Sequence, residues 1–388
     1  MKAMLKIKRF ALCVRGAAAC VVACVLAAGC KDLVTRDGPS GASPGGLDLL
    51  FKVPVDRADN AFVPATDGQR LYADVNRRIE AFDLSTGARL WSYLRPLGGP
   101  SSLVARDGRV FFAGDTAVAL DAASGRELWR HVLPSPAGLG ESAGDSDAYY
   151  VGMKDHRVYA LRATDGALLW SRDLGPDWPF GGVVRGMTVS GDTVYAAVEH
   201  DTGINGYIGT GDLFALDRRT GAVHWVFRNG DGTRLDIYQS AGRVAGRLLL
   251  LTANWENEYI ALDRLTGTEV WRAHGEDPYF GMDEAPEVQG DRAYFASQDQ
   301  YAYALDLATG RRLWRARVAS GASNVAPCGS RLLVQDLGLS VVDLGSGRML
   351  GRAYDSSTNE SLHTDFVVVG NRAYVFGITH LYGFECPT

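Results

Sequence analysis

The fold is decided by a stretch that recurs along the chain, Ala304-Leu305-Asp306-Leu307-Ala308-Thr309-Gly310-Arg311-Arg312-Leu313-Trp314. It has the form Ala-x-Asp-x-x-Thr-Gly-x-x-x-Trp. Close copies begin at Ala81, Ala119, Ala160, Ala215 and Ala261, and a degenerate copy runs from Val341 to Gly351. Self-similarity at a spacing of about 40 residues is the signature of a repeat protein, so the repeat has to be explained before any single residue.

Each residue type in the motif has a mechanical role. Asp and Thr side chains bond to nearby backbone groups and set a turn between two strands. Gly supplies the positive φ that such a turn requires. Trp buries a large face between neighbouring repeats and still has an N–H to donate. We therefore expect a structural docking role for Trp91, Trp129, Trp170, Trp225, Trp271 and Trp314.

A second phrase precedes each motif and supplies the remaining strands. It is a turn followed by a β-rich run, as in Gly290-Asp291-Arg292-Ala293-Tyr294-Phe295. With a short apolar segment before it, each repeat contains four short strands. Four strands per repeat of about 40 residues are typical of a β-propeller blade. No helical periodicity of useful length follows residue 30.

The two ends of the chain complement each other. The C-terminal residues give three strands, 366–369, 372–376 and 380–385, and the sequence stops at Thr388 before a fourth. Residues 48–55 form a strand without a partner, and Leu50-Phe51 aligns with Leu313-Trp314. Pairing them removes two exposed edges. The prediction is an all-β fold, an eight-bladed β-propeller of four-stranded antiparallel blades, closed by the N-terminal strand and forming a single domain over residues 48–388.

The first thirty residues indicate export. A basic segment from Lys2 to Arg9 is followed by a small apolar segment that is too short to span a bilayer comfortably. Leu26-Ala27-Ala28-Gly29-Cys30 resembles a bacterial lipobox. We expect residues 1–29 to be a lipoprotein signal peptide, Cys30 to be lipidated and residues 30–47 to be a flexible tether. The position after the lipobox cysteine is Lys31 and not Asp, which by resemblance to lipoprotein sorting signals implies the outer membrane, facing the periplasm, with the cell surface as an alternative.

The motif resembles the tryptophan-docking motif of the PQQ-like propeller repeats, and the resemblance covers residues 48–388. Two positions depart from it, Arg162 where Asp is usual and Gly351 where Trp is usual. An eight-bladed PQQ-like propeller on a lipoprotein tether resembles the BamB-type outer-membrane assembly lipoproteins. This resemblance implies a protein-binding scaffold without a cofactor, whose partner is an envelope protein such as the barrel-assembly machinery, bound through loops on one face.

Long, irregular connections cluster on blades four to six, on the face opposite the motif turns. They are acidic and aromatic, which suggests a protein-binding patch on a rigid scaffold. A solvated rim is the alternative interpretation. The candidate partner-binding residues are Asp177, Trp178, Phe180, His200, Asp201, Trp255, Glu256, Glu258, Asp277, Tyr279, Phe280, Asp283 and Glu284.

Charge narrows the class of partner. The formal net charge is -5, and loss of residues 1–29, with their five basic and no acidic side chains, would leave about -10. An acidic protein lacks the positive field that nucleic acid binding needs. We expect a monomeric propeller that contacts the membrane through its lipid anchor alone.

Two other functions share this architecture. A PQQ-dependent dehydrogenase would need Ca²⁺ on oxygen ligands, a carboxylate base and a stacked quinone. His200-Asp201 or Glu256 with Glu258 offer cation ligands, but their spacing is not diagnostic. We expect no catalytic residue, cofactor or metal. A sensor propeller that binds a ligand or saccharide is the remaining alternative.

Two cysteines remain in the propeller, Cys328 and Cys386. The predicted topology places both on the motif-turn face of adjacent blades. Exported proteins form disulfides readily. Because one cysteine lies nearer the ring axis than the other, the sequence leaves open whether they are bonded.

Overall fold

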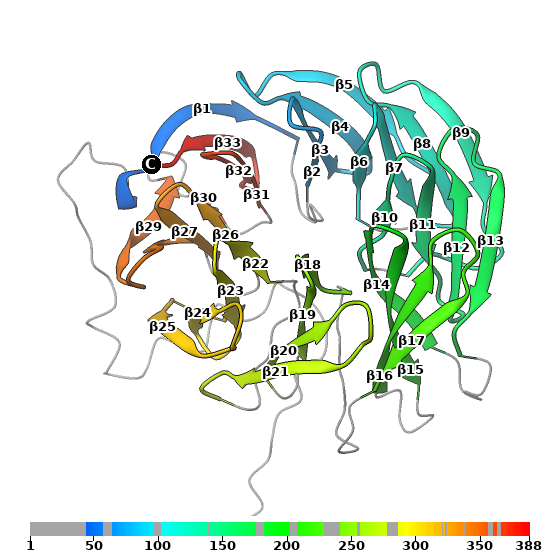
Figure 1. Cartoon of the computed structure of the whole chain (residues 1–388). Coiled ribbons are helices and arrows are strands. Elements are labelled where there is room, and N and C mark those ends of the chain that lie inside the picture. Colours follow the sequence, from blue (N-terminus) through cyan, green and yellow to red (C-terminus); the bar gives the residue numbers. More distant parts are fainter. Residues whose placement is uncertain are drawn as a thin grey trace, which may run out of the picture. The chain divides into compact units, whose positions relative to one another are not determined.

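The computed structural model describes residues 44–56, 64–96, 102–138, 140–175, 182–201, 208–228, 241–253, 257–277, 286–319, 321–322, 324–336, 338–355, 360–362 and 366–388. All of them belong to one unit, Gly41–Thr388. They form eight antiparallel sheets arranged in a ring, as Figure 1 shows. Seven sheets have four strands and one has five. No helix among these residues is long and apolar enough to span a membrane.

Blades one to four follow one another along the chain, and each contains four consecutive strands. Blade one is β2 (Ala65–Thr66), β3 (Arg70–Val75), β4 (Arg78–Asp83) and β5 (Arg89–Leu94). Blade two is β6 (Val104–Arg106), β7 (Arg109–Ala113), β8 (Thr116–Asp121) and β9 (Glu127–Val132). Blade three is β10 (Ala143–Gly144), β11 (Ala148–Gly152), β12 (Arg157–Arg162) and β13 (Leu168–Asp173). Blade four is β14 (Gly182–Ser190), β15 (Thr193–Asp201), β16 (Ile208–Asp217) and β17 (Val223–Phe227).

Blades five to eight complete the ring. Blade five is β18 (Arg243–Ala245), β19 (Leu248–Ala253), β20 (Glu258–Asp263) and β21 (Glu269–His274). Blade six is β22 (Glu287–Gln289), β23 (Arg292–Ser297), β24 (Tyr301–Asp306) and β25 (Arg312–Arg317). Blade seven is β26 (Asn324–Cys328), β27 (Arg331–Gln335), β28 (Leu339–Asp343), β29 (Met349–Asp355) and a fifth strand, β30 (Glu360–Ser361). Blade eight is β31 (Phe366–Val369), β32 (Arg372–Phe376), β33 (His380–Glu385) and β1 (Asp48–Pro54), which follows the 3-10 helix η1 (Pro44–Gly46).

The N-terminal strand closes the ring, which confirms the prediction from the two chain ends. β1 pairs antiparallel with β33, and Figure 1 shows the two strands side by side at the C-terminus. In this register Phe51 lies opposite Gly383. In blade one, Trp91 has the equivalent place opposite Ala81. Phe51 therefore occupies the position of a motif tryptophan in blade eight.

The motif turn forms as its residues predict. In blade six, Asp306 Oδ1 accepts hydrogen bonds from the backbone N–H of Thr309 at 2.9 Å and from its hydroxyl at 2.6 Å. The Gly310 N–H donates to the Asp306 carbonyl at 2.8 Å, and Gly310 has a φ of 70°. These bonds close a short turn between β24 and β25 on what we call the motif-turn face. The turns between second and third strands and the connections between blades lie on the opposite loop face.

Each motif tryptophan joins its blade to the next. The indole N–H donates to the backbone carbonyl that follows the motif Asp position of the next blade, at 2.9–3.3 Å. The ring also covers the next motif glycine so closely that a Cβ there would lie 2.6–2.7 Å from an indole carbon. The core consequently lies between blades: one cluster, for example, combines Ala81 of blade one with Val118 of blade two. Docking and closure of the turn depend on the same glycine.

The departure at Arg162 leaves the turn of blade three intact. The Gly166 N–H still donates to the Arg162 carbonyl, at 2.9 Å. Asp165 stands at the Thr position, where its Oδ1 accepts from the Ala167 N–H and its Oδ2 pairs with Arg162 at 2.9 Å. The Asp165–Arg162 ion pair and the Asp165 hydrogen bond therefore stabilise the same turn that Asp and Thr stabilise in blade six.

The departure at Gly351 coincides with two features at the boundary of blades seven and eight. Cys328 and Cys386 are joined by a disulfide, with their Cα atoms 5.7 Å apart. Leu47 is fully buried in the same cluster as both cysteines. Residues 44–47, which were expected to belong to the tether, are therefore part of the packed fold, because η1 packs on blade seven.

Candidate functional site: the loop face and the inner cavity

On the loop face, a buried amide joins blades five and six. Asn257 is 1% exposed, and its Nδ2 donates to the Asp277 carbonyl and to Asp299 Oδ2, both at 2.8 Å. Its Oδ1 accepts from the Tyr259 hydroxyl and the Ser297 hydroxyl, both at 3.0 Å. All four hydrogen-bonding positions of the amide are thereby used. The described ends of two long connections are held rigidly to the scaffold.

Asp299 extends this network toward the surface. The Tyr303 hydroxyl donates to Asp299 Oδ2 at 2.5 Å, and burial together with this carboxylate raises the pKa of Tyr303. The Glu276 N–H donates to the same oxygen at 3.0 Å, and the Glu276 carboxylate pairs with Arg312 and Arg315. Desolvation opposes ionisation of Glu276, but the two guanidinium groups outweigh it and lower the pKa of Glu276. The Glu276 carboxylate is therefore ionised at neutral pH and lies between two guanidinium groups.

A pair of histidines joins blades three and four on the same face. His156 Nε2 and His200 Nδ1 lie 3.2 Å apart. His200 Nε2 lies 3.3 Å from Asp212 Oδ2, which also accepts from Arg228 Nε at 3.0 Å. Desolvation, followed by the neighbouring His200, lowers the pKa of His156. A Cβ at Gly182 would lie 1.8 Å from His156 Nε2, so this position requires glycine.

This geometry corrects the expectation for His200. We expected the residue on the partner-binding face, but its side chain is 0% exposed and lies within the histidine pair. Glu258 is nearly buried as well, at 9% exposure, and pairs with Arg272 and His274. Asp277 is half-buried, and its carbonyl accepts from Asn257. These three residues help to hold the connections in place.

The other candidate residues lie outside the part of the chain that the structure describes. They are Asp177, Trp178, Phe180, Trp255, Glu256, Tyr279, Phe280, Asp283 and Glu284, together with the side chain of Asp201. Cys30 and the signal sequence also lie outside it. The assignment of a partner-binding role to these residues stays a prediction.

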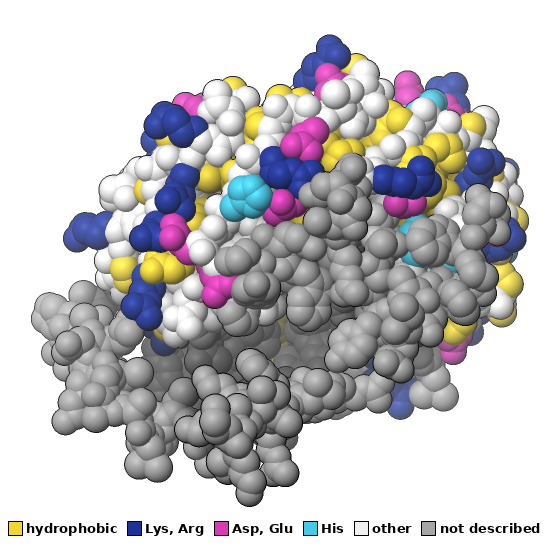
Figure 2. Space-filling model, turned by 90° about the horizontal axis from the view of Figure 1, so that it is seen from below, with side chains coloured by type: hydrophobic (Ala, Val, Ile, Leu, Met, Phe, Trp, Pro, Cys, Tyr) yellow, Lys and Arg dark blue, Asp and Glu magenta, His cyan; other side chains and the backbone are white. Residues whose placement is uncertain are grey.

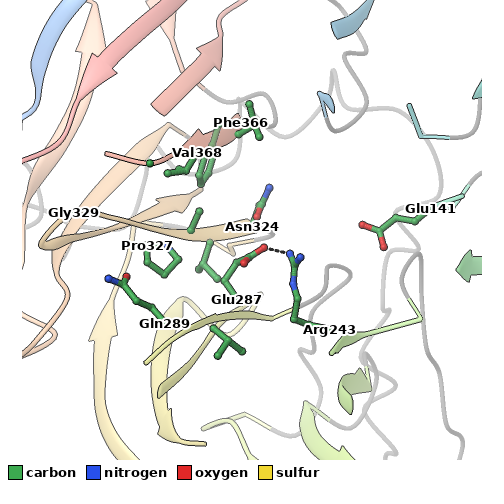
Figure 3. A pocket seen from close by; sticks show the side chains of 14 residues that line it. Glu141, Arg243, Glu287, Gln289, Asn324, Pro327, Gly329, Phe366 and Val368 are labelled. Carbon is green, nitrogen blue, oxygen red and sulfur yellow. Dashed lines mark hydrogen bonds and ion pairs between the residues drawn. The ribbon is translucent and has the colours of Figure 1, made fainter. Parts of the chain in front are cut away.

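The inner side of the ring holds a cavity of about 510 Å³. It is lined by the first strands of blades five to eight and by Glu141, which precedes β10 of blade three. Figure 3 shows Arg243 bonded to Glu287 and Glu141 pointing toward Arg243 from the other side. Arg243 also donates through Nε to the Pro286 carbonyl at 3.2 Å. Desolvation lowers the pKa of Arg243, while the Glu141 carboxylate opposes that shift.

The sequence interpretation missed the polar residues of this cavity. In the two loop-face networks it named His200 and Asp277 but missed His156, Asn257 and Asp299. It treated first strands as apolar, although Gly242-Arg243-Val244 places a charge in one of them. His156 has a positive φ of 64° and Asn257 one of 49°. An isolated His or Asn in a turn is a weak signal of that conformation, and nothing in the sequence indicates which turns meet.

The resemblance to PQQ-like repeats raises the question of whether these residues fit a calcium-bound quinone. Among the described residues, no group of three or more His, Cys, Asp or Glu side chains is placed to hold a metal ion. The cavity contributes two carboxylates, Glu141 and Glu287, and both interact with the Arg243 cation. A hard cation such as Ca²⁺ needs six to eight oxygen ligands. The described residues of the cavity therefore do not fit that group.

The surface charges are mixed. Figure 2 shows Lys and Arg side chains beside Asp and Glu side chains on the described part of one face, without a single basic patch there. Such a face lacks the continuous positive field of a nucleic-acid-binding surface.

The fold, the docked tryptophans and the braced loop face define a class: eight-bladed propellers of PQQ-like repeats. The protein-family model described as "Outer membrane protein assembly factor BamB" matches residues 48–146, 113–241 and 209–359. The chain belongs to this family.

Individual relatives include both assembly factors and enzymes. The outer membrane protein assembly factor BamB of Shewanella oneidensis is 25% identical over 354 residues, covering 84% of this chain and 84% of that protein. A polyvinylalcohol dehydrogenase of Sphingopyxis sp. is 28% identical over 192 residues, covering 47% of this chain and 24% of the enzyme. The chain thus spans about a quarter of the dehydrogenase, but most of the assembly factor.

Solved structures share the fold. BamB from Moraxella catarrhalis superposes with a TM-score of 0.65 at 19% identity, covering 87% of this chain and 97% of that one. A europium-containing methanol dehydrogenase superposes with a TM-score of 0.66 at 14% identity, covering 88% and 93%. At these identities the likeness concerns the propeller alone.

Proposed function

We propose that this protein is a non-enzymatic, lipid-anchored scaffold that assists the assembly of β-barrel proteins in the outer membrane. One observation carries the proposal: the family match extends over residues 48–359, and an assembly factor aligns over 84% of both chains. The dehydrogenase relative aligns over 24% of its own length, so most of that enzyme has no counterpart in the alignment.

The loop face is the proposed binding surface for a component of the barrel-assembly machinery. The Asn257 network and the histidine pair brace the described ends of its connections. A braced surface loses little conformational entropy on binding, which leaves more of the contact energy for affinity. Acidic and aromatic residues of the connections, such as Trp255 and Glu256, are the proposed contacts.

The proposed location is the periplasmic side of the outer membrane, through a lipid on Cys30. The first described residues, Pro44–Gly46, pack on blade seven at the start of β1. The fourth strand of each blade begins at the motif-turn face, so the tether joins the ring there. A tether that leaves the ring at this face would keep the loop face free for a partner.

Affinity capture from detergent-solubilised membranes tests the function. We expect the wild-type lipoprotein to recover barrel-assembly components, and Trp255→Ala with Glu256→Ala to weaken that recovery at least tenfold. Arg219→Ala is the matched control, because Arg219 is exposed in the motif turn of blade four, on the opposite face. Capture that the double variant leaves unchanged, with the same thermal unfolding, would overturn the loop-face assignment. Recovery of no barrel-assembly component would overturn the function.

A separate titration tests the enzymatic alternative. Added PQQ with Ca²⁺ should neither bind tightly nor support oxidation of an alcohol or sugar, because the described cavity lacks a calcium donor set. Binding together with turnover would replace the scaffold proposal by a dehydrogenase.

A further inference from the structure

The boundary between blades seven and eight differs from the six that carry a motif tryptophan. At each of those six, the indole of one blade bonds to a carbonyl and covers a glycine of the next. Blade seven has Gly351 at the tryptophan position, opposite Val341 in the pairing of β28 with β29. This boundary therefore lacks the indole that fastens those six.

Cys386 stands at the position that accepts the indole elsewhere. Glu385 ends β33 as Asp306 ends β24, and Cys386 follows it as Leu307 follows Asp306. The Leu307 carbonyl accepts the Trp271 N–H at 3.0 Å. Cys386 is instead bonded to Cys328, the last residue of β26 in blade seven. A covalent bond thus joins these two blades at the position where docking would have joined them.

The segment before β1 covers the same boundary. We call residues 44–47 the strap. Gly45 approaches blade seven so closely that a Cβ would lie 2.4 Å from Val341 Cγ1, and its carbonyl accepts from Arg331 Nε at 2.6 Å. Leu47 is fully buried in one cluster with Val341 and both cysteines. The strap packs where blade seven lacks its indole.

We propose that the Cys328–Cys386 disulfide replaces tryptophan docking at this boundary, so that the ring is completed by thiol oxidation. In the reduced chain, blade eight and the strap lose the fastening that holds them to blade seven. Blades one to six keep their docked indoles. Folding of the terminal blade is thereby coupled to an oxidising compartment, which agrees with the export signal but does not depend on the proposed partner.

The chemistry is a thiol–disulfide exchange. One cysteine thiolate attacks the disulfide of an oxidising dithiol protein or of oxidised glutathione and forms a mixed disulfide. The other thiolate then attacks this bond and forms Sγ–Sγ. Two protons and two electrons leave the pair, and the oxidant is released as two thiols. Cys328 is 0% and Cys386 1% exposed, so the exchange takes place while the boundary is open, and the product is then buried.

Hydrogen exchange on the full propeller chain tests the proposal. Unfolded protein is refolded either with a glutathione redox buffer or with a reductant, and mass analysis counts the free thiols. In the reduced sample we expect amide exchange at least tenfold faster in peptides covering residues 44–54, 326–335 and 366–388. Peptides of blades two to four should exchange at unchanged rates. Equal exchange in all peptides of the two samples would overturn the proposal.

The variant Cys328→Ala with Cys386→Ala is the control for the reductant. It should match the reduced wild type under both refolding conditions, with a melting temperature on the order of 5 °C below that of the oxidised protein. If the variant fails to fold, the comparison of amide exchange between reduced and oxidised wild type still tests the proposal. A reductant effect of equal size on this double variant would contradict a role for this disulfide.

A mutant cycle tests whether strap and disulfide act on one boundary. Leu47→Ala should cost less in melting temperature when the cysteines are absent than when they are present, because both changes open the same contact. Leu161→Ala, a fully buried position in blade three, is the matched control and should be additive. Additivity of Leu47→Ala with loss of the cysteines would overturn the shared role.

Discussion

At the scale of single residues, the motif glycine does two things. Its positive φ closes the turn, and its missing Cβ admits the indole of the preceding blade. Gly166 shows both, with a φ of +72° and a notional Cβ 2.6 Å from Trp129 Cε3. Gly108 has nearly the same φ, +71°, but nothing lies within 4 Å of its notional Cβ. The chain therefore contains a natural pair that separates backbone conformation from docking.

This pair supports a prediction for alanine substitution. Gly108→Ala should lower the free energy of unfolding by about 1 kcal/mol, the cost of a left-handed conformation for a residue with a Cβ. Gly166→Ala carries the same cost and must also displace the indole, so its total should be about 3 kcal/mol. Urea unfolding measures both. Equal losses would show that the indole contact contributes nothing at this position.

The sequence predicts such residues well because their roles are local and repeat. Asp306, Thr309 and Gly310 interact within one turn, so the residue types alone are enough to predict the contacts among them. The sequence also predicted that Trp271 packs between blades, because the tryptophan recurs at the same place in six repeats, but it did not show which group accepts the indole N–H. The sequence left the disulfide open. Cys328 and Cys386 are not part of a repeated motif, and the distance between them depends on where two turns meet across a blade boundary.

At the scale of elements, the histidine pair is a contact between blades that the repeat pattern does not predict. His156 belongs to the turn between β11 and β12, and His200, 44 positions further along the chain, belongs to β15. The sequence placed His200 near a surface because its connection is long and polar. It could not show that the turn of the preceding blade supplies a second ring, or that Gly182 makes room for it.

The pair predicts a stability that depends on pH. In the folded protein the pKa of His156 is lowered, first by desolvation and then by His200, against the pull of Asp173 and Asp155. In the unfolded chain it stays near its ordinary value of about 6.5. The unfolded state therefore takes up the proton more readily, and the stabilisation is complete above about pH 6.5 and is lost as pH falls toward the folded pKa. The loss should not exceed about 1.4 kcal/mol per pH unit for this one group.

Urea unfolding between pH 7.5 and 5 checks this prediction, with His156→Asn as the comparison. Asn tolerates the left-handed backbone that His156 adopts, with a φ of 64°, and does not titrate. The variant should be less stable at pH 7.5 and should vary less with pH. Parallel curves for variant and wild type would assign the pH dependence to other groups.

At the scale of the whole molecule, the ring is completed by strands from the two ends of the chain. The sequence predicted this closure because three strands at one end and one at the other add up to a blade. Phe51 then acts as the docking side chain of blade eight: a Cβ at Gly87 of blade one would lie 2.5 Å from its ring. The strap could not be predicted, since Gly, Pro and Ser before residue 47 are typical of a tether.

Phe51→Ala should therefore act on the whole ring. It removes an aromatic ring from the boundary between blades eight and one, and we expect a loss of about 3–5 kcal/mol in the free energy of unfolding. Leu49→Ala is the matched control on the same strand, because Leu49 is 54% exposed and should change stability by less than about 0.5 kcal/mol. Thermal or urea unfolding of the two variants decides the matter. Equal, small effects would show that β1 closes the ring through its backbone alone.

The pairing of β1 with β33 also sets an order of events in time. Asp48 lies opposite Glu385, so β1, the first strand of the ring to leave the ribosome, waits for the last. Until then an exposed edge and the Phe51 ring remain without their partners, a condition that favours aggregation. Bringing the two ends together requires closure of a loop that spans almost the entire propeller, and such long-range pairing is slow. Blades one to six can dock as they emerge, whereas the last blade depends on both ends of the chain, which leaves a defined interval in which a chaperone can act.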